Sequence, residues 1–351
     1  MSAPICVTGA NGYIAGWIIE LLLQGGYTVH GTLRNPDDPK NDFLKEIAVA
    51  NNAEKRLRLF KADLQQAGSF HAAIEGCDVV IHTAAVVTLD AKNPQKDMIE
   101  PTLAGVRNVI AACVAHHVKK VVYTSSVATI TCAEVKRPLE DRGKPFTEDM
   151  WLQNVDIRYA PYNYMKIEAE KLIKELWKGP MVSILPSWTL GPQQNTNVTS
   201  SQKIVELLLK RRYGKAVPPL YFDCVDVRDV ARAHIFAATS DVLRCERYTV
   251  SGNMNIPLSH VAALINAQFP KLNLGTKQIP WVGLWIASWF DKRIAPITLY
   301  EKSTPHSPLD NSKIRAAGFQ YQYTILSQTL RDSVLSFKRQ RIVADPTGAI
   351  F

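Results

Sequence analysis

A tyrosine and a lysine lie four residues apart at Tyr162 and Lys166, in a segment whose apolar spacing predicts a helix over 162–177. On a helix this spacing places the phenol and the ammonium on one face, one turn apart. A phenol that exchanges protons at neutral pH needs nearby positive charge, because its ordinary pKa is about 10. We therefore predict that Tyr162 is a general acid/base and that Lys166 tunes it. We also predict that Ser126 polarises a substrate carbonyl oxygen.

The tyrosine–lysine pair carries little weight by itself, because a chain of this composition contains roughly one such pair by chance. The position of the pair in the chain is what supports a catalytic role. The pair opens a helix that comes after a fifth predicted strand and after the Ser125-Ser126 dipeptide that follows that strand. The same chain also begins with the features of a dinucleotide site.

The first 34 residues predict a strand, a glycine turn and a helix, followed by a second strand. The turn reads Gly9-x-x-Gly12-x-x-Ala15, and such small residues let the backbone approach a pyrophosphate at the helix N-terminus. No carboxylate that could hold the ribose hydroxyls of NAD follows the second strand. Arg34 stands there instead, with Lys40 shortly beyond. A guanidinium suits a 2′-phosphate, so we predict NADP(H), the alternative being a solvated surface arginine.

The length and composition of the chain limit the kinds of protein that it can be. The chain has 351 residues, enough for one large or two moderate domains, with 46% hydrophobic and 21% charged residues, as in ordinary soluble enzymes. A net charge of +9 is spread along the chain without a basic stripe, which argues against nucleic-acid binding. Six widely spaced cysteines predict a reduced, cytoplasmic protein without a metal site. We expect no secretory peptide before the first strand and no apolar run long enough to span a bilayer.

Strands and helices alternate from the start of the chain, which predicts an α/β fold with a Rossmann-type doubly wound parallel sheet. We assign residues 1–185 and about 220–250 to an NADP-binding domain. Residues 186–219 and 251–345 are assigned to a smaller, mostly C-terminal substrate-binding subdomain. In such sheets ligands lie beyond the carboxyl ends of the strands. Arg34, Asp63, Thr83 and the Ser125-Ser126 pair all follow predicted strands, so we expect them to line one crevice.

Two later segments depart from the alternation. Residues 131–154 lack a regular period and predict a long loop near the mouth of the crevice. Trp281, Trp285 and Trp289 have helical spacing and share one face. Three interpretations of that face stay open: an ordinary buried surface, the wall of an apolar substrate pocket, or a membrane contact through 278–290.

The motifs jointly resemble an extended short-chain dehydrogenase/reductase, of the dihydroflavonol reductase, cinnamoyl-CoA reductase and bacterial aldehyde reductase group in the NAD-dependent epimerase/dehydratase superfamily. The resemblance covers about the first 235 residues. It is carried by Val7-Thr-Gly-Ala-Asn-Gly-Tyr-Ile, Thr32-Leu-Arg-Asn-Pro36, Lys61-Ala-Asp-Leu64, Ile81-His-Thr-Ala-Ala85, Thr124-Ser-Ser126, Tyr162-x-x-x-Lys166, Leu185-Pro-Ser-Trp-Thr-Leu-Gly-Pro192 and Val225-Asp-Val-Arg-Asp-Val-Ala231.

The resemblance implies an NADP(H) site with Asp63 and Leu64 beside the adenine and the Pro186–Thr189 segment near the nicotinamide. Together with the turn and strand-end residues above, the expected cofactor-binding set is Gly9, Asn11, Gly12, Tyr13, Ile14, Arg34, Lys40, Asp63, Leu64, Thr83, Ala84, Ala85, Ser125, Tyr162, Lys166, Pro186, Trp188, Thr189 and Ser201.

The leading expectation for function is an NADPH-dependent oxidoreductase acting on CH–OH groups, which reduces an aldehyde or ketone on an apolar or aromatic skeleton, as a monomer or homodimer. Residues 82–87 lack the Ser-Pro or Thr-Pro that plant members carry there, which argues against flavonoid or cinnamoyl-CoA substrates. Alternatives are oxidation of a 3β-hydroxysteroid, epimerisation of a sugar nucleotide, and a protein that senses NADP without turnover.

Overall fold

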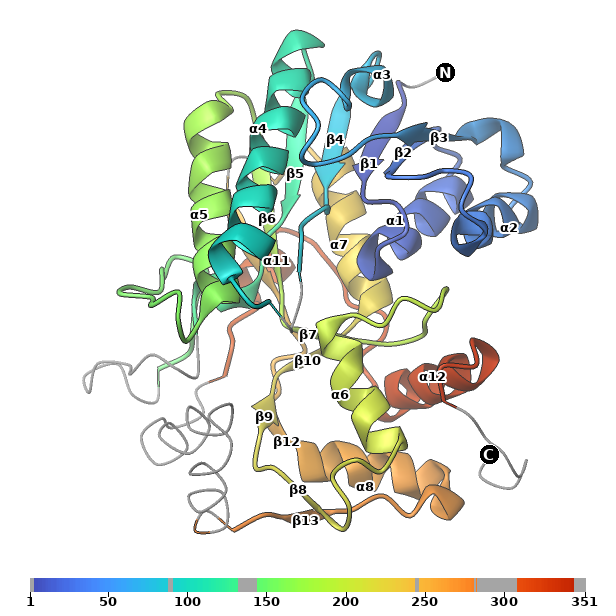
Figure 1. Ribbon diagram of the computed structural model, residues 1–351, viewed down its shortest axis with the longest axis vertical. Helices are drawn as coiled ribbons and strands as arrows, with labels where there is room; N and C mark the ends of the chain where they lie inside the picture. The colour runs from blue at the N-terminus through green and yellow to red at the C-terminus, as the bar shows by residue number, and fades with distance from the viewer. Residues whose placement is uncertain are drawn as a thin grey trace.

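The computed structural model describes residues 3–87, 91–131, 144–243, 246–280, 282 and 308–343. Its main layer is a seven-stranded sheet of order β11-β6-β5-β4-β1-β2-β3 (Figure 1). Every neighbouring pair in this sheet is parallel, and β1 lies between β4 and β2. The strands are β1 (Ile5–Thr8), β2 (Val29–Leu33), β3 (Leu57–Lys61), β4 (Val79–His82), β5 (Lys120–Thr124), β6 (Met181–Pro186) and β11 (Arg247–Val250).

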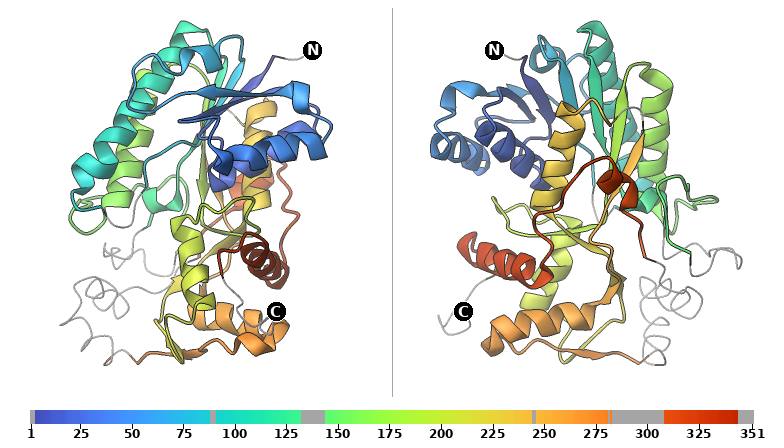
Figure 2. Two further views of the ribbon diagram at one scale, coloured as in Figure 1. Left: turned by 45° about the vertical axis from the view of Figure 1, so that its right-hand side comes forward. Right: turned by 180° about the vertical axis from the view of Figure 1, so that it is seen from behind.

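Helices cover both faces of the sheet, because its central strands are apolar on both sides and need two packed layers. One face packs against α1 (Tyr13–Gln24), α2 (Asp42–Ala50) and α7 (Val227–Thr239). The other packs against α3 (His71–Ile74), α4 (Glu100–Ala115) and α5 (Pro161–Leu176) (Figures 1 and 2). The predicted doubly wound α/β fold is confirmed.

A smaller unit lies beyond the carboxyl ends of the strands (Figure 1). Its core contains Trp188, Leu208, Val261, Val334 and Phe337. Its two-stranded sheets pair β7 (Trp188–Leu190) with β10 (Cys224–Asp226), β8 (Ala216–Val217) with β13 (Lys277–Gln278), and β9 (Tyr221–Phe222) with β12 (Ile256–Pro257). Its helices are α6 (Ser200–Leu209), α8 (Leu258–Gln268), η6 (Pro270–Leu272) and α12 (Leu326–Arg339).

The domain assignment made from the sequence stays a prediction, but the cores show which segments pack together. The α11 helix (Ser312–Ala316) lies within the stretch assigned to the substrate subdomain. Its Ile314, together with Phe319, nevertheless packs in the core beside α7 and β11 of the seven-stranded sheet. The tryptophans at 281, 285 and 289 and residues 132–143 of the predicted loop lie outside the described residues.

Several predicted boundaries differ from the structure. Residues 42–55 are polar and helix-forming and predict a helix, but α2 ends at Ala50 and is followed by a short turn, η2 (Glu54–Arg56). The sequence also predicts a long helix over 97–117, whereas the structure starts with η3 (Gln95–Ile99) and continues as α4. The combined span from Gln95 to Ala115 is long and apolar enough to cross a membrane, contrary to the sequence expectation. Val106, Val109 and Ile110 are buried against the sheet, as in the core helix of an α/β protein.

Four cysteines lie within the described residues: Cys6, Cys77, Cys113 and Cys224. All four are unpaired and buried. Burial raises the pKa of each thiol, to about 12 for Cys77 and Cys113. They therefore pack as small apolar side chains.

Candidate active site

The glycine turn joins β1 to α1 and leaves the helix N-terminus open. Gly9 has φ +66°, and a Cβ there would come within 3.1 Å of the Ala84 Cβ and 3.2 Å of its Cα. Gly12 is the N-cap of α1, whose first turn has no side-chain cap and no acidic residue. Unpaired N–H groups and the positive end of the helix dipole thus remain available for an anion. This turn fits the pyrophosphate of a dinucleotide.

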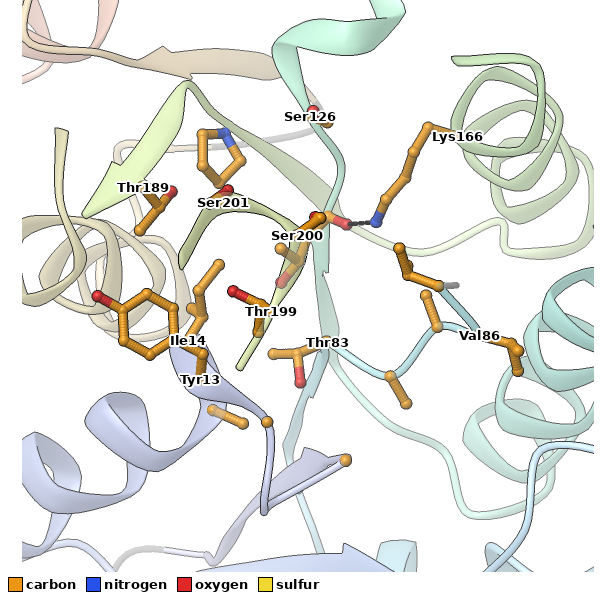
Figure 3. Close-up of a pocket in the computed structure, with 18 of the residues that line it drawn as sticks. Tyr13, Ile14, Thr83, Val86, Ser126, Lys166, Thr189, Thr199, Ser200 and Ser201 are labelled. Atoms are coloured by element: carbon orange, nitrogen blue, oxygen red, sulfur yellow. Dashed lines mark hydrogen bonds between the residues drawn. The ribbon is translucent and has the colours of Figure 1, made fainter. Parts of the chain in front are cut away.

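A cavity of about 1020 Å³ extends from this turn across the carboxyl ends of the strands. Figure 3 shows Tyr13 and Ile14 from α1, Thr83 from the segment after β4, and Lys166 from α5 around it. The predicted residues that line it are Gly9, Asn11, Gly12, Tyr13, Ile14, Arg34, Asp63, Leu64, Thr83, Ala84, Ala85, Ser125, Ser126, Tyr162, Lys166, Pro186, Trp188, Thr189 and Ser201. The expectation of one crevice at the strand ends agrees with this arrangement.

Lys40 is the one predicted site residue that does not line the cavity. It lies in η1 (Pro39–Asn41), a tight turn that the Asp38 side chain caps by accepting a hydrogen bond from the Lys40 backbone N–H at 3.0 Å. The Lys40 side chain is exposed. Sequence proximity to Arg34 therefore does not bring Lys40 to the wall of the crevice.

Tyr162 and Lys166 lie one turn apart on α5, as their spacing predicts, and both line the cavity. The Lys166 ammonium is buried and donates a hydrogen bond to the Thr124 carbonyl oxygen at 2.8 Å (Figure 3). Burial lowers the pKa of Lys166 to about 8, and the Glu170 carboxylate opposes that effect. Burial raises the pKa of Tyr162, while the neighbouring Ser126 hydroxyl lowers it. Near pH 7 the site thus holds a protonated phenol beside an ammonium.

Ser126 lies just after β5 and begins the short helix η4 (Val127–Thr129). Its Oγ accepts a hydrogen bond from the Ala128 backbone N–H at 3.1 Å. A serine hydroxyl also has one hydrogen to donate, so this contact leaves Ser126 able to bind an oxygen in the cavity. Asn163, beside Tyr162 on α5, donates to the Ala128 carbonyl at 2.8 Å and to the Thr131 carbonyl at 3.2 Å. The loop that carries Ser126 is thereby attached to the helix that carries Tyr162.

Several cavity residues were not predicted. Thr199 and Ser200 reach the cavity at the start of α6, beside the predicted Ser201 (Figure 3). Lys203, one turn further along α6, also lines the cavity. Val86, Val87, Val127 and Ala128 add apolar side chains to the cavity lining, and Val127 and Ala128 directly follow Ser126. Thr131 also lines the cavity. The polar segment before α6 was the available signal, because hydroxyl residues at a helix start often contact anions.

The segment leading into α6 is attached to α1. The Asn195 amide donates to the Asn11 carbonyl at 3.0 Å, and the Trp17 indole N–H donates to the Pro192 carbonyl at 2.9 Å. Buried Gln202 donates to the Tyr13 hydroxyl at 2.5 Å. Because Asn11 and Tyr13 belong to the glycine turn and the start of α1, the walls of the cavity from both units are fixed to each other.

The fold and the site together match a known family. The NAD dependent epimerase/dehydratase family matches residues 5–250. The chain is an extended short-chain dehydrogenase/reductase. This reductase is 32% identical over 354 residues to cinnamoyl-CoA reductase CAD2 of Medicago truncatula, with 96% of each chain covered. It is 33% identical over 283 residues to dihydroflavonol 4-reductase of Callistephus chinensis, covering 78% of this chain and 75% of that one.

Solved structures of other reductases have the same fold. Vestitone reductase from alfalfa matches this short-chain dehydrogenase/reductase with a TM-score of 0.73 and 26% identity, covering 97% of this chain and 100% of that one. Gre2 from Candida albicans, in complex with NADPH, matches with a TM-score of 0.76 and 24% identity, covering 97% and 99%. The short-chain dehydrogenase/reductase is thus an oxidoreductase of the dihydroflavonol reductase and cinnamoyl-CoA reductase type with a nicotinamide cofactor. Within the described residues no group of three or more His, Cys, Asp or Glu is placed to hold a metal ion.

Proposed function

We propose that the protein reduces an aldehyde or ketone on an apolar or aromatic skeleton, with NADPH as cofactor. The observation that carries the proposal is the shared cavity, which has the open helix N-terminus at one end and Ser126, Tyr162 and Lys166 in its wall. The apolar side chains of Val86, Val87, Val127 and Ala128 in the cavity lining support an apolar substrate skeleton.

The nicotinamide of bound NADPH supplies the hydride in this reaction. Two side chains stabilise the negative charge that develops on the substrate oxygen. Ser126 donates a hydrogen bond to this oxygen, and Tyr162 transfers a proton to it. The Lys166 ammonium stabilises the phenolate that results. A protonated phenol beside an ammonium near pH 7 is the starting state that reduction needs.

Exchange of Tyr162 for Phe tests the proposal. Removing only the hydroxyl takes away the proton donor while keeping the ring that lines the cavity, so we expect kcat to fall by about 100- to 10,000-fold. The Kd for NADPH should stay within about twofold, because the ring still fills its place. Turnover is followed by the absorbance of the reduced nicotinamide over a panel of aldehydes and ketones.

The outcomes separate the alternatives. Near-normal turnover by Tyr162→Phe would remove Tyr162 from the mechanism. Tight NADPH binding by the unmodified protein with no turnover of any member of the panel would favour a sensor of NADP and overturn the reductase proposal.

A further inference from the structure

A buried ion pair lies behind the catalytic residues and has no part in the reaction described above. Glu170 follows Lys166 by one turn of α5, and its side chain has no exposed surface. Arg247 is the first residue of β11 and is 6% exposed, and its Nε lies 3.0 Å from Glu170 Oε1. The two atoms make a charge contact, although the N–H is not aligned for a hydrogen bond. Burying two charges is costly, so each needs further partners.

The carboxylate holds the strand end that precedes Ser126. Glu170 Oε2 accepts a hydrogen bond from the Ser125 Oγ at 2.5 Å, and both groups are buried. Ser125 is also tied to β6, because its backbone N–H donates to the Ile184 carbonyl at 2.8 Å. Glu170 and Lys166 share one helix, so this bond sets the end of β5 against the helix that carries Tyr162.

The guanidinium holds the segments that follow Ser126. Arg247 Nη2 donates to the Thr129 hydroxyl at 2.5 Å, and Thr129 ends η4. Its Nη1 donates to the Glu148 and Met150 carbonyls, both at 2.7 Å. The guanidinium also stacks 3.8 Å from the centre of the Trp151 ring. The pair thus joins α5, the Ser126 loop, the 148–151 segment and the edge strand of the sheet.

Glu170 also acts on the charge of Lys166. Burial lowers the pKa of Lys166, and the Glu170 carboxylate raises it. The His82 and His234 rings are buried near the ammonium and neutral near pH 7, because burial and the Lys166 charge lower their pKa to about 3 and about 4. Lys174 also lies 3.7 Å from Glu170 but is 44% exposed, so solvent screens it. The groups facing Lys166 are Tyr123 from β5, His82 from β4, His234 from α7, and Tyr162 and Glu170 from α5.

We propose that Glu170, anchored by Arg247, is a positioning residue for carbonyl reduction: it sets Ser126 against Tyr162 and keeps Lys166 charged. This inference rests on the proposed function. Glu170 touches neither substrate nor cofactor in this role, since Ser125 and Lys166 lie between it and the cavity.

The first test compares Glu170→Gln with Lys174→Met, which removes the exposed partner of the same carboxylate. We expect Glu170→Gln to lower kcat by about 100-fold through misplacement of Ser126, with the KM for NADPH changed less than about threefold. The kcat/KM for reduction should fall above the pKa of Lys166, and this fall should begin about one pH unit lower in Glu170→Gln. Lys174→Met should keep the profile of the unmodified protein.

The second test measures the pKa of the Lys166 amine in the absence of turnover. Trace acetylation of the cofactor-free protein across pH 6–10, with mass spectrometry of the peptide that contains Lys166, gives the pKa of its amine. It should fall in Glu170→Gln and stay unchanged in Lys174→Met. Ser125→Ala, which keeps every charge, should lower kcat without moving this pKa, and it provides the positioning test if Glu170→Gln does not fold.

These readouts separate the two proposals. A uniform loss of rate at every pH, with Lys166 titrating as in the unmodified protein, would mean that Glu170 is only structural. Unchanged kcat in Ser125→Ala would overturn the positioning role. If the unmodified protein reduces no carbonyl compound, the reductase function fails, while the acetylation experiment still decides whether Glu170 sets the charge of Lys166.

Discussion

We predict that Arg34 decides the choice between NADPH and NADH. It follows β2, lines the cavity and is exposed, with no carboxylate among the other residues of the β2 end that line the cavity. A guanidinium can make two parallel hydrogen bonds to a phosphate, but it has little to offer a neutral ribose hydroxyl pair.

Exchange of Arg34 for Ala tests the preference for NADPH. Losing charge-assisted hydrogen bonds costs about 1.5–3 kcal/mol, so we expect the Kd for NADPH to rise by about 10- to 100-fold. The Kd for NADH should change little, and fluorescence titration measures both. Lys45→Met, which removes an exposed cation of the same domain paired with Asp42, is the matched control. Equal weakening by the control would mean that Arg34 acts only through the general positive field.

Many of the predicted residues that line the cavity follow the end of a strand or share a helix face. Arg34, Thr83 and Ser126 follow strands, and parallel strands end at one edge. Glu170 and Arg247 could not be paired in this way, because nothing in their sequence neighbourhoods shows that α5 and β11 meet. Lys40 illustrates the same limit on sequence reasoning. The tight turn at η1 sets the position of its side chain, and the order of the strands does not reveal that turn.

At the level of elements, the packing of α4 shapes the part of the cavity that Leu64 lines. Gly105 lies on the face of α4 that meets Leu64, and a Cβ on it would lie 2.8 Å from the Leu64 Cβ and 2.9 Å from its Cγ. Leu64 lines the cavity, and the Asn108 side chain of α4 also donates to the Leu64 carbonyl at 2.8 Å. The absence of a side chain at Gly105 therefore allows helix and loop to approach closely.

Exchange of Gly105 for Ala tests this packing. The added methyl group cannot be accommodated by rotating the end of Leu64, because its Cβ is also too close, so the loop must move. We expect weaker NADPH binding, by about tenfold, with kcat at saturating cofactor within about twofold. Gly76→Ala is the control: its position has nothing within 4 Å of the added methyl but has φ +74°, so it strains the backbone without touching the cavity. Similar NADPH affinity in the two variants would contradict the prediction.

Helices and strands were well predicted where the apolar pattern and the stop residues that define them lie within the element or next to it. The run at β6 and the glycines after α1 lie where the apolar pattern and the stop signals place them. Residues 191–201 are polar and rich in turn-forming residues, yet α6 begins at Ser200, because its buried face packs against distant Leu258 and Leu330. The two-stranded sheets of the smaller unit are too short to show alternation.

The stability of the whole molecule should depend on two buried histidines that stay neutral. The His234 Nε2 and the Thr124 hydroxyl are 2.7 Å apart, and the His82 Nδ1 and the Thr8 hydroxyl are 2.8 Å apart. Their pKa values are lowered to about 4 and about 3 by burial, whereas unfolded histidine titrates at about 6.5. Between these values the unfolded chain binds protons that the folded chain cannot take up, so stability falls as the pH drops below about 6.5.

Urea unfolding at pH 7, 6 and 5 measures this effect. Each histidine should lower the free energy of unfolding by up to about 1.4 kcal/mol per pH unit in this range. His234→Gln keeps a hydrogen-bonding side chain but cannot titrate, so its free energy of unfolding should depend less steeply on pH. An equal slope in the unmodified protein and the variant would show that His234 does not resist protonation in the fold. His260→Gln, at an exposed position on α8 of the smaller unit, is the control.

The burial of the cysteines bears on whether a carbonyl substrate can alkylate the protein. Carbonyl compounds of the proposed kind are electrophiles, and conjugated ones alkylate exposed thiolates. Cys6, Cys77, Cys113 and Cys224 are inaccessible and stay protonated well above neutral pH. None of these four thiols would be alkylated as turnover proceeds, so modification at these positions should not limit the lifetime of the protein among reactive aldehydes.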